Sequence, residues 1–243
     1  MFKKRKLISI MLTVSMMLTL FPFAAFAEEG GQAGAEQTQQ EPAQSADVAT
    51  QLPEAVDGVI TLKQDVTVTA LPTNATIDLK GYNLTYNSMR SVASGENEVL
   101  TIKDSSVSNG ARDGKLILTG KNKVNDSYFN PQKGATVNIE NISVECNTSA
   151  FYPQGNAAAV NIINSDVKAA CYGIATNAGA DENNGVKINL INSKIVTTSV
   201  DGDNCAVMIN VAGTLIITAQ LSVTVKPLSC VLGMRTSPIL TFK

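Results

Sequence analysis

A short pattern of apolar and polar residues recurs along most of this chain, and a recurring pattern restricts the fold more strongly than composition does. Each copy has an apolar residue, a small polar residue or glycine two positions later, and a second apolar residue three positions after that. The middle residues of the copies are Gly81, Asp104, Asn141, Asn164, Asn192 and Thr218. They are 23, 37, 23, 28 and 26 residues apart, so we expect one structural unit to repeat about every 23 residues.

A second pair of matching segments supports this period. Phe129–Gln132 (Phe-Asn-Pro-Gln) recurs 22 residues later as Phe151–Gln154 (Phe-Tyr-Pro-Gln), and each leads into a run of alternating apolar residues. Such alternation is typical of β-strands. We therefore predict an all-β fold over residues 56–225, in which about seven coils stack as a parallel β-helix solenoid. A β-sandwich is the alternative.

The recurring polar position predicts a ladder of side chains. Asn141 has the same strand parity as Ile139, so we expect its side chain to point into the coil near a turn. A buried amide needs partners, and stacked amides on successive coils can bond to one another. The predicted members of this structural ladder are Asp104, Asn141, Asn164 and Asn192. A polar binding site is the alternative use of the column.

The two ends of the chain differ from the repeat region. Residues 1–27 have a basic start, an apolar run and an Ala-Phe-Ala site, the pattern of a secretory signal peptide; an uncleaved anchor helix is the alternative. Residues 28–55 are rich in Gln, Glu, Ala and Gly, and we expect a flexible linker or a cleaved pro-segment. We predict a secreted, extracellular protein, free or held at the cell surface, that meets a membrane only through its export signal.

Residues 226–243 carry no repeat and no recognisable cap for the last coil. We expect an irregular tail here. Because solenoids need a covered terminal coil, we hypothesise that the reading frame is truncated or shifted relative to a longer repeat protein. A third interpretation of the chain follows, in which it is a stalk that associates end to end through uncovered coils.

Composition and charge exclude several functions. The chain has no His, so it contains no Ser-His-Asp triad, no Cys-His pair and no imidazole zinc site. Loss of the signal peptide, with its four basic residues, leaves 15 basic and 21 acidic residues and a net charge of −6. An acidic protein binds nucleic acid poorly, so we expect no nucleic-acid partner.

Several stretches resemble a known group of repeats. Four stretches are similar to right-handed parallel β-helix repeats of the pectate-lyase-like superfamily. They are Ala75–Thr85 (ATIDLKGYNLT), Leu100–Val107 (LTIKDSSV), Tyr172–Asn177 (YGIATN) and Gly213–Thr218 (GTLIIT). More narrowly, they resemble repeats of secreted, adhesin-like surface proteins of Gram-positive bacteria. The resemblance implies a right-handed β-helix. It does not fix an activity, because the superfamily includes pectin-degrading enzymes, phage tailspikes and non-catalytic modules.

The lyases of this superfamily bind calcium through Asp and Glu oxygens and use an Arg or Lys base, and the resemblance implies the same for a catalytic member. The candidate metal ligands here are Asp181, Asp201 and Asp203, in loops that lengthen their coils. Short Asp, Asn and Gly runs are equally typical of exposed turns. We expect no cofactor apart from this candidate Ca²⁺, and a Ca²⁺-dependent polysaccharide lyase acting on acidic glycans is the alternative function.

Aromatic side chains offer a different chemistry, because the apolar faces of sugars stack on exposed rings. Phe129 and Phe151 are in register with Ile174 and Met208, which predicts an inward column. Three tyrosines lie near that column, Tyr128, Tyr152 and Tyr172. We expect them to form a sugar-binding strip. The leading interpretation is an exported, non-catalytic surface module that binds a glycan or a surface protein.

The chain has four cysteines, at positions 146, 171, 205 and 230. An extracellular protein can hold disulfides. Spacing makes Cys205 and Cys230 neighbours on adjacent coils, within reach of a disulfide, while free buried thiols are the alternative.

Overall fold

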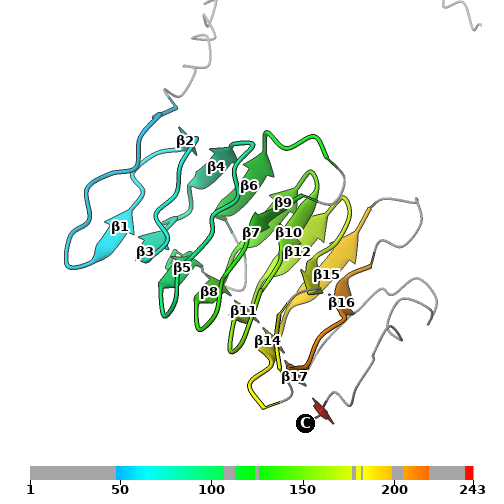
Figure 1. Ribbon diagram of the computed structural model, residues 1–243. Helices are drawn as coiled ribbons and strands as arrows, with labels where there is room; N and C mark the ends of the chain where they lie inside the picture. Colours follow the sequence, from blue (N-terminus) through cyan, green and yellow to red (C-terminus); the bar gives the residue numbers. More distant parts are fainter. Residues whose placement is uncertain are drawn as a thin grey trace, which may run out of the picture. The chain divides into compact units, whose positions relative to one another are not determined.

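The computed structural model describes residues 48–106, 113–123, 126–176, 179–181, 183–198, 205–218 and 239–242. Within them every regular element is a β-strand, and the strands form three sheets (Figure 1). All the strand pairs are parallel, which an antiparallel β-sandwich does not allow. The predicted all-β class is confirmed. In this part of the chain no helix is long and apolar enough to cross a membrane.

In the part of the chain that the structure describes, the sheets have eight, six and four strands. The eight-stranded sheet contains, in order, β1 (Val59–Thr61), β3 (Ala75–Asp78), β5 (Val99–Lys103), β8 (Thr136–Glu140), β11 (Ala159–Ile163), β14 (Val186–Ile191), β17 (Gly213–Thr218) and β18 (Ile239–Phe242). The six-stranded sheet contains β2 (Val66–Val68), β4 (Asn83–Asn87), β6 (Lys115–Thr119), β9 (Ser143–Cys146), β12 (Asp166–Ala169) and β15 (Lys194–Thr197). The four-stranded sheet contains β7 (Ser127–Phe129), β10 (Ser149–Phe151), β13 (Ile174–Thr176) and β16 (Val207–Ile209).

The chain winds through these sheets in a fixed order. From β8 onward each turn passes through the eight-, the six- and then the four-stranded sheet, and every strand pairs with its equivalent one turn later (Figure 1). Val137 lies beside Val160, and Val160 beside Ile188, which reproduces the steps of 23 and 28 residues seen in the sequence. This path is consistent with a parallel β-helix.

The long step of 37 residues is explained by the pairing of β5 with β8. Ile102 lies directly beside Ile139, and the residues between them supply β6 and β7 to the other two sheets.

The first and last copies of the pattern are out of register. Asp78 pairs with Lys103, so Leu79 rather than Gly81 lies next to Asp104. At the other end, Thr218 pairs with Ile191 rather than aligning with Asn192. The spacing of the polar residues does not fix register in these copies, because turns of different length absorb one or two residues.

The ends of the predicted solenoid also differ from expectation. Ala49, within the predicted linker, forms a parallel bridge with Val66. Within the predicted irregular tail, β18 pairs in parallel with β17, since its residues have high β propensity. The predicted signal peptide (1–27), the remainder of the linker up to residue 47, and residues 226–238 and 243 lie outside the described residues.

The core lies between the sheets and follows the period-two alternation of each strand. Val137, Ile139, Val160 and Ile162 are fully buried on the inner face of the eight-stranded sheet. In the four-stranded sheet Phe151 lies beside both Phe129 and Ile174, as predicted. The rings of Phe129 and Phe151 stack with centroids 5.5 Å apart. The next member of the column is Val207 rather than Met208, which instead pairs with Ala175.

The turn from the eight- to the six-stranded sheet holds three of the predicted ladder residues. Asn141, Asn164 and Asn192 have left-handed backbones, with φ of 59°, 48° and 47°. Asn164 Nδ2 donates to Asn141 Oδ1 and Asn192 Nδ2 donates to Asn164 Oδ1, both at 3.2 Å. We expected these side chains to point inward, but Asn164 and Asn192 are exposed. The left-handed residue breaks the strand alternation, and Asn tolerates this conformation better than most residues.

The inward position of this turn is taken by the residue that follows the asparagine. Ser165 and Ser193 are buried. The hydroxyl of Ser165 donates to Ile163 O at 2.8 Å and accepts from Ile142 N at 3.1 Å. These bonds satisfy backbone groups where the strands end, so serine rather than asparagine lines the inside of the corner.

Candidate ligand-binding surface

The structure does not bring the three predicted tyrosines together. Tyr128 is fully buried, because all three residues of β7 are enclosed. Tyr152 and Tyr172 are half-buried. Phe151 pairs with Ile174, so Tyr172 lies beside Ser149. Ser149 is three residues from Tyr152 along its strand, which separates Tyr172 from Tyr152 by roughly 10 Å. The prediction that Tyr128 belongs to an exposed sugar-binding strip is wrong, because this side chain is buried. Tyr152 and Tyr172 are too far apart to form a continuous strip by themselves.

Of the three predicted metal ligands, Asp181 is the one that the structure describes. Asp181 is exposed, and one of its carboxylate oxygens accepts from Asn183 N at 3.0 Å and from Asn184 N at 2.9 Å. The other accepts from Asn156 Nδ2. Asp201 and Asp203 lie outside the described residues. Among the residues that are described, no cluster of three or more His, Cys, Asp or Glu side chains is placed to hold a metal ion.

The cysteines are buried where the structure describes them. Cys146 and Cys171 carry free thiols. Cys230 lies outside the described residues, so the predicted pairing of Cys205 with Cys230 is not described. Burial raises the pKa of the Cys146 thiol to about 12 and also raises that of Cys171. Burial therefore favours the protonated form of the Cys146 and Cys171 thiols, which is the less nucleophilic form.

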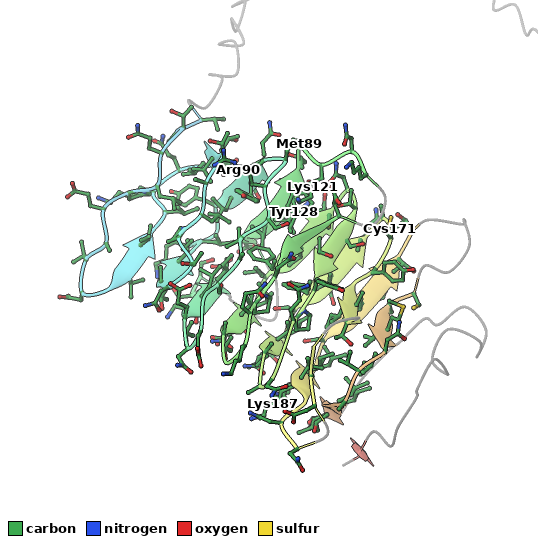
Figure 2. All side chains as sticks on the ribbon, in the orientation of Figure 1. Met89, Arg90, Lys121, Tyr128, Cys171 and Lys187 are labelled. Carbon is green, nitrogen blue, oxygen red and sulfur yellow. The ribbon has the colours of Figure 1, made fainter. Side chains whose placement is uncertain are left out.

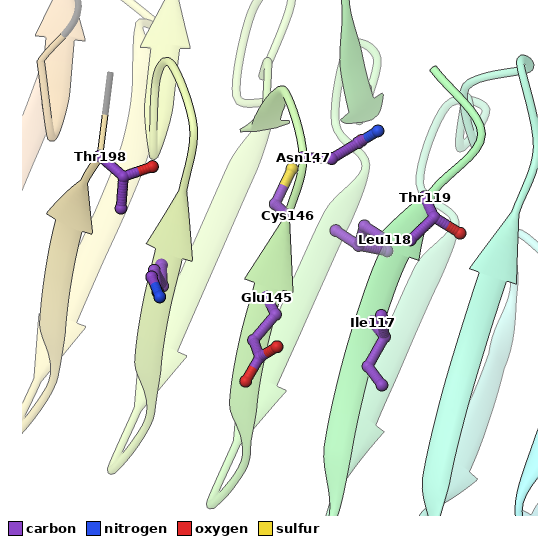
Figure 3. Close-up of a pocket in the computed structure, with 8 residues that line it drawn as sticks. Ile117, Leu118, Thr119, Glu145, Cys146, Asn147 and Thr198 are labelled. Atoms are coloured by element: carbon purple, nitrogen blue, oxygen red, sulfur yellow. The ribbon is translucent and has the colours of Figure 1, made fainter. Parts of the chain in front are cut away.

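A pocket of about 250 Å³ lies on the outer face of the six-stranded sheet (Figure 3). Its lining comes from four successive strands or the residues just after them: Ile117, Leu118, Thr119, Glu145, Cys146, Asn147, Lys168 and Thr198. Ile117, Glu145 and Lys168 lie side by side in register, and strand alternation turns all three outward. The buried residues Leu118 and Cys146 belong to the sheet beneath them.

The charges at the pocket are partly paired. Lys115 Nζ lies 3.2 Å from Glu145 Oε1, and the two side chains are 46% and 50% exposed. An exposed pair of this kind contributes at most about 1 kcal/mol to stability, so it does not lock Glu145 in place. The pocket combines an apolar side chain, two charges, two hydroxyls and an amide on a regular sheet. It therefore offers contacts for a polar ligand.

Asn147 connects the pocket to the interior. Its Oδ1 accepts from the Tyr128 hydroxyl at 2.7 Å, and its Nδ2 donates to Lys121 O at 2.8 Å. The Tyr128 hydroxyl in turn accepts from Lys121 N at 2.9 Å. Each functional group of the Asn147 amide is thus held from inside, while one N–H and one lone pair are left for a ligand.

Lys121, whose carbonyl oxygen accepts from Asn147, is buried, with only 5% exposure. Figure 2 shows it next to Tyr128. Its Nζ donates to Met89 O at 2.8 Å and to Ser91 Oγ at 3.2 Å, and lies 5.4 Å from the centre of the Tyr128 ring. Burial lowers the pKa of Lys121 and raises that of Tyr128. The sequence does not predict this cluster, because a single Lys in a loop gives no signal of burial.

A second asparagine ladder was also missed. On the outer face of the eight-stranded sheet Asn189 Nδ2 donates to Asn161 Oδ1 at 2.6 Å, Asn161 Nδ2 to Asn138 Oδ1 at 2.7 Å, and Asn138 Nδ2 to Thr101 Oγ1 at 3.0 Å. The available signal was an Asn three residues before each turn asparagine.

Comparisons with protein-family models, with curated proteins and with solved structures find no match for this chain.

Proposed function

We propose that this protein is an exported, non-catalytic surface module that binds a glycan through the pocket on the outer face of the six-stranded sheet. The observation that carries the proposal is the lining of that pocket. Ile117 offers an apolar surface for the C–H face of a sugar, and the side chains of Thr119, Asn147 and Thr198 offer hydrogen bonds to its hydroxyls.

The fold supports this role. We propose a right-handed parallel β-helix of the pectate-lyase-like kind, in keeping with the winding path through three parallel sheets. Stacked coils give a rigid surface on which each side chain is positioned by two neighbouring strands. The pattern of residues 1–27 supports export, and an extracellular glycan would then be within reach.

The chemistry of the pocket favours binding over turnover. The Cys146 thiol is neutral because burial raises its pKa to about 12, and the Glu145 carboxylate is paired with Lys115. Neither group is arranged as an activated nucleophile beside a base. The side chains that line the pocket instead supply positioned hydrogen bonds and charge.

The test is retention without turnover. The full chain would be passed over a panel of immobilised neutral and acidic polysaccharides with Ca²⁺ present, while ultraviolet absorbance reports unsaturated sugar ends. We expect at least one polymer to retain the protein with no rise in absorbance. A chelator-sensitive rise in absorbance would replace the proposal with the lyase alternative, and retention by no polymer would reject glycan binding.

A further inference from the structure

We infer that the pocket is specific for a glycan unit that carries one negative charge, a carboxylate or a phosphodiester, and that Lys168 binds this charge. The inference rests on the proposed function and narrows its ligand class. It follows from the charges on the four strands that form the pocket, from the pairing of those charges, and from the neutral side chains around them.

The four strands have a positive outer face. β6, β9, β12 and β15 carry five charged residues, all at outward positions: Lys115, Glu145, Asp166, Lys168 and Lys194. Three lysines against two acids give this surface a local charge of +1, although the whole chain is acidic. The surface is thus complementary to a monoanion.

Of the three lysines on these strands, Lys168 is the one that lines the pocket. Glu145 forms its ion pair with Lys115, and Asp166 lies opposite Lys194 in register. Lys168 lies between Glu145 and Val196 in register and forms no ion pair with any residue that the structure describes. It is exposed and lines the pocket, so its ammonium group can reach a bound anion.

The rest of the lining indicates a hydroxylated ligand with a single charge. Thr119, Asn147 and Thr198 lie at the ends of the same strands and offer neutral donors and acceptors around Lys168. No arginine lies on these four strands, whereas sites for dianionic phosphate groups favour arginine clusters. A pocket of about 250 Å³ is smaller than the roughly 300–1,000 Å³ of drug-sized sites, which suits one sugar unit of a longer chain.

The test compares opposite charge changes in the same pocket. Three probes would be titrated into the full chain: a hyaluronan oligosaccharide, its carboxyl-reduced neutral counterpart, and a poly(glycerol phosphate) oligomer. Lys168→Gln should weaken binding of the anionic probe about five- to tenfold, and Glu145→Gln should strengthen it by a similar factor. Lys187→Gln, an exposed lysine on the eight-stranded sheet, is the matched control and should change nothing.

The outcomes separate this inference from the proposed function. Binding of one anionic probe, with the two opposite effects, supports it and identifies the carboxylate or the phosphodiester as the source of charge. Equal binding of the neutral and anionic sugars overturns the charge assignment while glycan binding stands. The same holds if Lys168→Gln and Glu145→Gln both weaken binding, because a zwitterionic ligand would require both charges. If none of the three probes binds while a neutral polymer of the panel does, the inference fails alone; if no polymer binds, both fail.

Discussion

Asp104 shows that equivalent positions in a repeat can hold side chains with different roles. Its side chain is fully buried, and its carboxylate accepts from Gly81 N, Ser106 N and Gly114 N at 3.1, 2.8 and 2.7 Å and from the Ser106 hydroxyl. Burial alone would raise the pKa of Asp104, but these hydrogen bonds outweigh it and lower the pKa below 3.8. It fixes the loop ends around β5 and β6, a role that the ladder pattern did not predict.

Replacing this carboxylate should destabilise the protein. Asp104→Asn puts an NH₂ group against backbone donors, and we expect a loss of about 2 kcal/mol in the free energy of unfolding at pH 7. Urea denaturation followed by circular dichroism measures this loss. Asp113→Asn, an exposed change nearby, is the control and should stay within about 0.5 kcal/mol of the wild type.

The same residue predicts a dependence on pH. A carboxyl whose pKa is lower in the folded state contributes stability that is present above its unfolded pKa and is lost as pH falls through the folded value. Wild-type stability should therefore decrease below pH 3.8, and Asp104→Asn should remove part of this slope. Identical slopes in the two proteins between pH 5 and about pH 2 would contradict the assignment.

At the scale of the element, strands and turns use asparagine in different ways. Asn161 lies in β11 and bonds to neighbours along the sheet, while Asn164 lies in the following turn with φ of 48°. The sequence predicted the strands and their step, because period-two alternation and a recurring column are local signals. It did not predict which way the turn side chains face, since one left-handed residue reverses the alternation.

This difference gives a paired prediction for the turn and the strand. Asn164→Ala should be less stable than Asn164→Gly by about 1 kcal/mol, because alanine is strained at positive φ. At Asn161 the order should reverse, since glycine is unfavourable inside a strand. Thermal unfolding of the four variants measures both differences. The same order at both positions would show that backbone conformation does not determine the result.

At the scale of the whole molecule, stability comes from columns that run through successive turns of the chain. Phe151 is fully buried between Phe129 and Ile174. The positions in this column were predictable because Phe-x-Pro-Gln recurs at one period. The pocket was not, because it is formed by residues 117, 145, 168 and 198, which come from four different turns and belong to no motif.

Truncating the middle of that column should affect the whole fold. Phe151→Ala should lower the free energy of unfolding by about 3–5 kcal/mol, since the neighbours on both sides lose contact with the ring. Guanidinium denaturation measures the change, and Phe151→Leu should recover most of it. A loss under about 1 kcal/mol for the alanine variant would mean that the column is not continuous.

Glycan binding by the outer face of the six-stranded sheet is the proposal on which the assigned function depends. Its most direct test is a calorimetric titration of the best-retained glycan into the wild type and into two matched variants, Ile117→Ser in the pocket and Ile163→Ser on the outer face of the eight-stranded sheet. We predict that Ile117→Ser weakens binding about fivefold or more, because it removes the apolar surface under the sugar, and that Ile163→Ser leaves the affinity unchanged. Unchanged affinity for Ile117→Ser, or a loss only for Ile163→Ser, would contradict the claim.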